Sequence, residues 1–263
     1  MHSSLDVSCI LPAQPMSKNR HVVFLHGFLE APSMWNSILG QLSKANLTLH
    51  FPKLPGHDSH TLPETWSMNA WVNDILKQLK LSEGENAFFI GHSMGGYVLS
   101  QLAMQHPEKV RGLCLFHSRA GLDSEEKRAN RLRAIDAAKE SQSLYVRGMI
   151  TGLFDAHNRE KLHAEIETQI AYAQALPLPA IEASLMVMRD RPDAVEGLQL
   201  RHFPLYYFLG ENDAAVRLED MTEELTALPG HTAHIAHQTG HMGHLESPRE
   251  AGAFIQRVLK ADE

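Results

Sequence analysis

Short apolar runs alternate along the chain with segments whose apolar residues recur at helical spacing. Residues 21–27 (HVVFLHG) form an apolar run that ends at a glycine, which is typical of a buried strand. Residues 68–81 place Trp71, Ile75 and Leu79 on one helical face. The predicted strands cover residues 21–27, 47–54, 86–93, 110–118, 205–213 and 231–238, and the predicted helices 33–44, 68–81, 94–106 and 247–259. This alternation predicts an α/β fold with a mostly parallel central sheet and flanking helices.

Two of the predicted helices begin at residues suited to capping. Ser33 is a candidate N-cap for the helix at 33–44. The last helix has Ser247 as its candidate N-cap, Pro248 at the first helical position and Glu250 where a capping box needs an acid. These positions predict where both helices start.

One long region interrupts the alternation. Residues 120–200 contain helical patterns but no convincing strand. The helical patterns cover residues 123–140, 143–154, 158–176 and 179–190. We therefore predict a helical cap at 120–200, inserted into a core built from residues 1–119 and 201–263. The first 20 residues are expected to hold at most one or two short antiparallel strands.

Composition narrows the classes of function. The 263 residues carry a formal net charge of −7 and no long block of Lys or Arg, so nucleic acid is not an expected partner. The N-terminus lacks a secretory pattern, and no apolar run approaches the roughly 20 residues that span a bilayer. Cys9 and Cys114 form neither a metal-binding spacing nor a disulfide framework. We expect a cytoplasmic protein that does not associate with membranes.

A serine lies between glycines where a predicted strand meets a predicted helix. The stretch Gly91-His92-Ser93-Met94-Gly95 is a G-x-S-x-G sequence with the strand before it and the helix after it. In that setting the glycines permit a sharp turn that lifts the serine hydroxyl above the sheet edge. The alternative is a glycine-rich turn whose serine only caps the helix. We favour a nucleophilic serine.

A nucleophilic serine needs a base, and the base needs an orienting acid. Asp213 stands in a turn at the end of the fifth predicted strand, just beyond its apolar run, and His241 stands in a glycine-flanked loop after the sixth. Ser93, Asp213 and His241 thus each lie at the carboxyl end of a strand, the edge where open parallel sheets bind ligands.

Five short motifs strengthen this interpretation. They are HGF at 26–28, LPGHDSH at 54–60, GHSMGG at 91–96, GEND at 210–213 and GHMGHLESP at 240–248. Together, and in this order, they resemble the α/β-hydrolase superfamily, in its branch of small single-domain esterases and lactonases with a helical cap. The resemblance implies Ser93 as nucleophile, Asp213 as acid and His241 as base. It also implies an oxyanion hole made by the backbone N–H groups of Phe28 and Met94.

Two rivals for these roles remain open. His244 is an alternative base, but the family pattern, a histidine directly after glycine and about five residues before a glutamate, fits His241. Asp123 is an alternative acid, because some family members place the acid after the fourth predicted strand. We favour His241 and Asp213. His92 and His26 are expected to have structural roles.

The sequence gives less support for a functional role of the histidines at 231–237 and of the arginines in or near the cap. His231, His234 and His237 alternate across a predicted strand and lack a completing carboxylate or cysteine, so no metal site is expected. Arginines in or near the cap are either surface charges or a means of holding a substrate carboxylate, and the sequence leaves this open. They are Arg119, Arg128, Arg131, Arg147 and Arg189.

The sequence thus predicts a serine hydrolase that cleaves a carboxylic ester or similar small acyl substrate with an apolar part, without a cofactor, as a monomer or weak homodimer. Carbon–carbon bond hydrolysis, enol-lactone hydrolysis and perhydrolysis use the same triad and remain alternatives, because fold does not determine substrate. A ligand-binding or signalling protein on the same scaffold is the alternative from another class.

Overall fold

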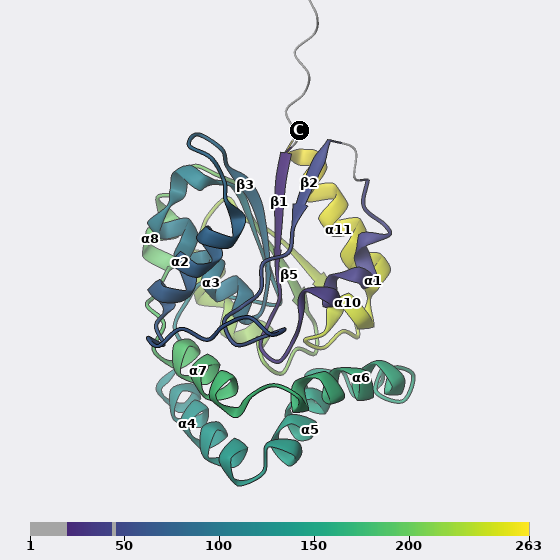
Figure 1. Ribbon diagram of the computed structural model, residues 1–263. Helices are drawn as coiled ribbons and strands as arrows, with labels where there is room; N and C mark the ends of the chain where they lie inside the picture. Colours follow the sequence, from purple (N-terminus) through teal and green to yellow (C-terminus); the bar gives the residue numbers. More distant parts are fainter. Residues whose placement is uncertain (1–19, 44–45, 263) are drawn as a thin grey trace, which may run out of the picture.

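A single parallel sheet forms the centre of the molecule (Figure 1). The computed structural model describes residues 20–43 and 46–262, and the strands predicted before residue 20, like Cys9, lie outside them. The strand order is β2-β1-β3-β4-β5-β6. The strands are β1 (Arg20–Leu25), β2 (Leu47–His50), β3 (Ala87–His92), β4 (Val110–Phe116), β5 (Leu205–Gly210) and β6 (Thr232–Ala236). Each adjacent pair is parallel, as the sequence predicted.

Helices cover both faces of the sheet. In Figure 1, α2, α3 and α8 lie on one side and α1, α10 and α11 on the other. Alternate residues of β1 point to opposite faces of the sheet. Val23 packs in the hydrophobic cluster that contains Trp71, and Phe24 packs in the cluster that contains Trp35. These helices are α1 (Asn36–Leu39), α2 (Met68–Leu79), α3 (Met94–Gln105), α8 (Val195–Gln199), α10 (Gly243–Glu246) and α11 (Pro248–Ala261). Burial of both strand faces explains the continuous apolar runs in the sequence.

Four helices, here named the cap helices, lie together at the carboxyl ends of the strands (Figure 1). They are α4 (Glu125–Glu140), α5 (Gln142–Leu153), α6 (His163–Gln174) and α7 (Leu178–Arg189). No described residue from 120 to 200 belongs to a strand, which agrees with the sequence prediction. Shorter elements complete the fold: 3-10 turns at Pro32–Trp35, Pro107–Lys109 and Leu218–Met221, and α9 (Thr222–Ala227).

One predicted helix start was wrong, and the capping box predicted at the other helix did not form. The segment predicted as a helix from Ser33 is a 3-10 turn, Pro32–Trp35, followed by the single turn of α1, so Ser33 is not an N-cap. α11 does begin after Ser247, but its hydroxyl donates to the Gly243 carbonyl. Glu250 accepts a hydrogen bond from His234 Nε2 instead of closing a capping box. Ser247 thus has a local partner four residues earlier, whereas the partner of Glu250 comes from β6, which the spacing of a capping box cannot reveal.

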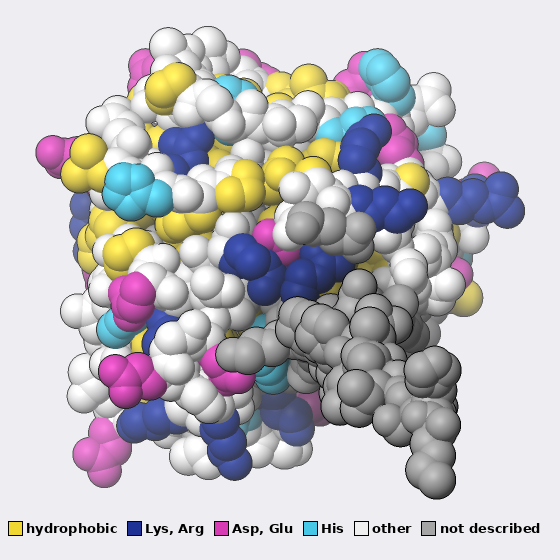
Figure 2. Space-filling model, turned by 90° about the horizontal axis from the view of Figure 1, so that it is seen from above, with side chains coloured by type: hydrophobic (Ala, Val, Ile, Leu, Met, Phe, Trp, Pro, Cys, Tyr) yellow, Lys and Arg dark blue, Asp and Glu magenta, His cyan; other side chains and the backbone are white. Residues whose placement is uncertain are grey.

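The face opposite the cap helices carries charges of both signs. Figure 2 looks onto the molecule from the end opposite the cap helices and shows basic and acidic side chains interspersed with apolar ones. In the described part of the chain, no helix by itself has the length and apolar content to cross a bilayer; only α6 and α7 taken together reach them, and they meet at a bend of 100°.

Candidate active site

Ser93 occupies a strained turn between β3 and α3. Its backbone has φ 49° and ψ −117°, a conformation that is costly for any residue with a Cβ. A Cβ on Gly91 would lie 2.6 Å from the Gly96 nitrogen, and one on Gly95 would lie 2.6 Å from the Leu25 carbonyl oxygen. The first glycine therefore permits the turn itself, and the second lets α3 approach β1. This steric requirement is what the sequence pattern predicted.

The sheet register brings three loops to one edge. Leu25 pairs with Gly91 across β1 and β3, and Gly210 pairs with Ala236 across β5 and β6. The chain therefore leaves these strands at the same end, where Ser93, Asp213 and His241 follow. The cavity described below is lined by both Ser93 and His241.

Asp213 and His241 form a buried hydrogen-bonded pair. His241 Nδ1 donates to Asp213 Oδ2 at 2.8 Å, which leaves Nε2 with the lone pair that can accept a proton. The backbone N–H groups of Ala215 and Val216 both donate to Asp213 Oδ1 at 2.8 Å. The His241 N–H donates to the Leu153 carbonyl at 2.7 Å, so the end of cap helix α5 also positions the histidine.

A second histidine, which the sequence analysis did not single out, binds the same carboxylate. His117 Nδ1 donates to Asp213 Oδ2 at 3.0 Å. Burial lowers the pKa of His117 to about 4, so this ring is neutral at physiological pH. Burial alone would raise the pKa of Asp213, but the His241 and His117 rings outweigh it and hold that pKa well below its usual range. Asp213 therefore stays ionised.

Glu30 and His92 form a buried ion pair behind the site. Glu30 Oε2 accepts hydrogen bonds from the Gly27 N–H at 2.7 Å and from His92 Nδ1 at 2.6 Å. His92 Nε2 donates to the His241 carbonyl at 2.9 Å. Both nitrogens of His92 thus donate, which only an imidazolium can do. Burial lowers the pKa of His92, but the Glu30 carboxylate outweighs burial, so that the pKa of His92 is raised. Burial likewise raises the pKa of Glu30, but the His92 ring outweighs burial, so that the pKa of Glu30 falls to about 2.

The loop after β1 is held from two sides. His26 Nε2 accepts from the Leu54 N–H at 3.0 Å, and its Nδ1 donates to the Gly27 carbonyl at 2.9 Å. Phe28 follows directly and lines the cavity. Met94 is the first residue of α3, so its N–H has no partner one turn earlier in that helix. The oxyanion role of these two N–H groups stays a prediction.

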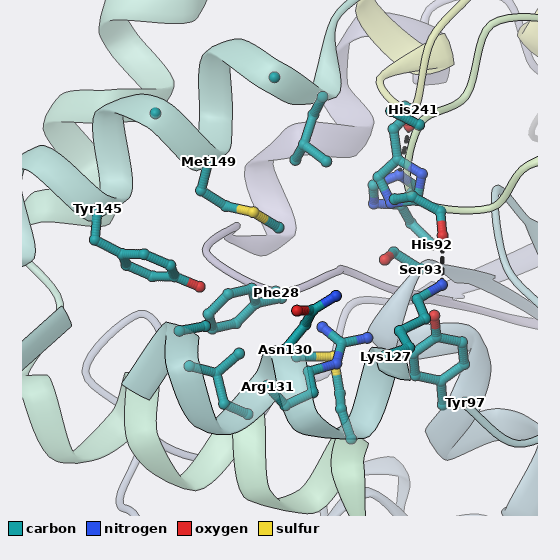
Figure 3. A pocket seen from close by; sticks show the side chains of 18 residues that line it. Phe28, His92, Ser93, Tyr97, Lys127, Asn130, Arg131, Tyr145, Met149 and His241 are labelled. Atoms are coloured by element: carbon teal, nitrogen blue, oxygen red, sulfur yellow. Dashed lines mark hydrogen bonds between the residues drawn. The ribbon is translucent and has the colours of Figure 1, made fainter. Parts of the chain in front are cut away.

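A cavity of about 410 Å³ opens beside Ser93 (Figure 3), within the size range of small-molecule sites. Figure 3 shows the Ser93 hydroxyl at the side of the cavity where the His241 and His92 rings lie. Much of the remaining wall is apolar: Phe28, Ala134, Met149, Leu153, Leu185, Met188, Ala214 and Ala215. Most of these residues come from the cap helices.

The rivals for base and acid have other partners. The His244 ring is buried, with Nε2 3.8 Å from Glu30 Oε1. Asp123 binds the guanidinium groups of Arg131 and Arg191 at 3.1 and 2.8 Å. Of the cap arginines, Arg131 lines the cavity; Arg119 pairs with Glu224, Arg147 with Glu167, and Arg128 and Arg189 with Asp190.

Two groups of side chains have ligand atoms close enough together to hold a metal ion. They are Glu30, His92 and His244, and His117, Asp213 and His241. In the first group a hydrogen bond joins His92 to Glu30, and His244 Nε2 lies 3.8 Å from Glu30 Oε1. In the second group both rings are hydrogen-bonded to Asp213. The histidines of the predicted sixth strand do not converge: His231 binds the Leu228 carbonyl, His234 binds Glu250 and His237 lies near Glu211.

Comparison with known proteins agrees with this geometry. The model of the Alpha/beta hydrolase family matches residues 22–253. A 2-succinyl-6-hydroxy-2,4-cyclohexadiene-1-carboxylate synthase of Salmonella agona (strain SL483) is 28% identical over 95% of this chain and 97% of its own length. A pimeloyl-[acyl-carrier protein] methyl ester esterase of Citrobacter koseri is 38% identical over 36% of this chain and 35% of its own. A malate-bound esterase of Thermogutta terrifontis superposes with a TM-score of 0.83 at 24% identity, covering 94% of this chain and 91% of that one.

Proposed function

Because the chain belongs to the alpha/beta hydrolase family, we propose that it is a serine hydrolase that cleaves a carboxylic ester or a similar small acyl substrate. The observation that carries the proposal is the Asp213–His241 pair, which opens onto the same cavity as Ser93. The esterase names among its relatives and structural neighbours support the same class of reaction.

The proposed reaction has two halves. His241 Nε2 removes the Ser93 proton as the hydroxyl oxygen attacks the acyl carbon, and the imidazolium then protonates the leaving alcohol. Water repeats the sequence on the acyl-enzyme and releases the acid. Asp213 stays ionised, holds the ring through Nδ1 and stabilises the imidazolium.

Charge on the substrate oxygen would be met by backbone donors. The N–H groups of Phe28 and Met94 are our candidates, and one such donor contributes about 3 kcal/mol to the transition state in comparable enzymes. Loss of the Glu30 or His26 contacts would act indirectly, by displacing the loop that carries Phe28.

A lyase-type reaction is the second candidate function. The relative from Salmonella agona, which matches over nearly the whole chain, is a synthase, whereas the esterase of Citrobacter koseri matches about a third of the chain. In such a reaction the same Ser93–His241 pair would remove a proton from a substrate carbon. The electrons of that C–H bond would form a carbon–carbon double bond as the leaving group departs from the neighbouring carbon, and no acyl group would form on the serine.

Acyl-enzyme formation tests the proposal. The wild-type protein is mixed with a para-nitrophenyl ester series of increasing acyl length, and para-nitrophenol release is followed alongside the intact mass of acid-quenched protein. We expect turnover and an acyl adduct on Ser93. Ser93→Ala should lose at least about a thousandfold in kcat/KM.

Ser100→Ala is the matched control. Ser100 lies in α3, the helix that begins directly after Ser93, and its hydroxyl donates to the Gly96 carbonyl away from the cavity. It should keep wild-type turnover. Equal activity of the wild type and Ser93→Ala would refute the proposal, whereas Ser93-dependent elimination without an adduct would favour the lyase reaction.

A further inference from the structure

The charged side chains around the cavity have one sign. Among the described residues that line it, none is Asp or Glu, whereas Lys127 and Arg131 both line it from α4. The two are four residues apart, so they lie on one face of that helix. The cavity wall is thus positively charged although the whole chain has a formal net charge of −7.

Arg131 is fixed so that part of its guanidinium remains available. Its Nε donates to Asp123 Oδ2 at 3.1 Å, which orients the planar group. Figure 3 shows the guanidinium projecting from α4 into the cavity. The two terminal nitrogens of a guanidinium held through Nε form a fork that matches a carboxylate.

Asp123 does not neutralise this site. Its carboxylate also binds Arg191 Nη2 at 2.8 Å, so one negative charge is shared by two buried or nearly buried guanidinium groups. Arg191 in turn lies 4.1 Å from the centre of the Tyr97 ring, which lines the cavity. The trio of Asp123, Arg131 and Arg191 therefore carries one net positive charge beside the cavity wall.

Lys127 adds a second cation nearer to the loop that holds Asp213. Its Nζ donates to the Ala215 carbonyl at 2.6 Å, which uses one of its three protons. Asn130 lines the same wall as a neutral donor. Apolar side chains, including Phe28 and Met149, make up much of the rest of the cavity.

We propose that this wall of α4 binds a carboxylate of the substrate through Arg131, with Lys127 as a second cation, so that the preferred substrates are half-esters of small dicarboxylic acids or acyl compounds of similar charge. This inference rests on the proposed function. It assigns the acyl chain to the apolar wall, the ester carbonyl to Ser93 and the free carboxylate to Arg131.

Matched substrates test the assignment. Monoethyl glutarate carries the carboxylate, and the ethyl ester of glutaric acid monoamide has the same shape without the charge. Ethanol release gives kcat/KM for both. The wild type should prefer the charged ester by at least about tenfold, and Arg131→Gln should bring that ratio close to one. Lys127→Gln should lower it less.

Arg128→Gln is the matched control, because Arg128 lies on the same helix but pairs with Glu125 and Asp190 outside the cavity. It should keep the wild-type ratio. A wild-type ratio near one, or the same ratio in Arg131→Gln and wild type, would overturn the inference while leaving ester hydrolysis intact.

Binding without catalysis separates the two proposals. Calorimetric titration of Ser93→Ala with glutarate should show a site that weakens at least about tenfold when Arg131→Gln is added. Arg131-dependent glutarate binding in a protein that cleaves no ester would support the carboxylate site and refute both the proposed function and the half-ester substrates. Inorganic phosphate binding more tightly than glutarate would overturn the assignment to a carboxylate.

Discussion

Replacing Glu30 by Gln removes a buried charge while keeping its shape. The side chain is 1% exposed, and its Oε2 accepts from both the Gly27 N–H and His92 Nδ1. A glutamine amide oxygen can accept the same two bonds. The amide nitrogen would take the place of Oε1, which has no hydrogen-bond partner among the described residues.

The size of the effect follows from the two hydrogen bonds. A bond to a charged group contributes about 1.5–3 kcal/mol and a neutral one about 0.5–1.5 kcal/mol, so two such bonds lose about 2–3 kcal/mol together. His92 has a raised pKa in the folded protein, so its contribution is complete below 6.5 and is lost as the pH rises through that pKa. Glu30, with a pKa of about 2, contributes fully above 4.5 and loses its contribution as the pH falls towards 2. The pair is therefore most stabilising between pH 4.5 and 6.5.

Urea unfolding at about pH 5.5 and about pH 9 measures this. We expect Glu30→Gln to lower the free energy of unfolding by about 2–3 kcal/mol at the lower pH and by less at the higher one. Glu83→Gln, at an exposed loop position, should change it by less than about 0.5 kcal/mol. A loss below about 1 kcal/mol at the lower pH, or a loss that grows at the higher pH, would refute the reasoning.

The same variant reports on positioning. Glu30 holds Gly27, next to Phe28, and His92 holds the His241 carbonyl. We expect kcat for a para-nitrophenyl ester to fall by about tenfold or more, because small displacements of catalytic groups are costly. An unchanged kcat would show that the backbone of this loop is held without the charge.

The remaining predictions concern stability. Gly95→Ala should lower the free energy of unfolding by more than about 3 kcal/mol or prevent folding, because the added Cβ would meet the Leu25 carbonyl. Gly148→Ala, within α5 and with no heavy atom within 4 Å of the added Cβ, should raise the free energy of unfolding in urea by about 0.5–1 kcal/mol. A wild-type urea midpoint for Gly95→Ala would contradict the steric argument. Acid should also destabilise the fold. Burial lowers the pKa of His26 and His244 to about 3 and of His57 and His117 to about 4. Since these rings are neutral in the fold, their stabilisation is present above pH 6.5 and is lost as the pH falls, by about 1.4 kcal/mol per pH unit for each proton taken up on unfolding. The urea midpoint should therefore be lower at about pH 5 than at about pH 7, and an equal or higher midpoint would contradict this.

The sequence by itself determined the alternation of strands and helices and the turn around Ser93, although it did not show that the segment after β1 forms only short turns. The β3 strand and α3 helix follow from local periodicity, and Gly91 and Gly95 follow from the steric needs of one turn. The order of Ser93, Asp213 and His241 was predicted because parallel strands deliver their ends to a common edge. Their chemical roles stay predictions for the experiments above.

Tertiary structure alone decided the partners of these residues. His117 and Asp213 are 96 positions apart, and Glu30 and His92 are 62 apart, so no local pattern links them. For the second pair the sequence did carry one signal, namely Glu30 within the apolar stretch FLEA. A charged side chain in a segment that is expected to be buried requires a partner. The capping box at Ser247 and Glu250 failed for the same reason: His234 competes for the glutamate from another element. Periodicity reports which face of an element is buried, whereas hydrogen-bond partners and the charge of a cavity depend on which elements the fold brings together.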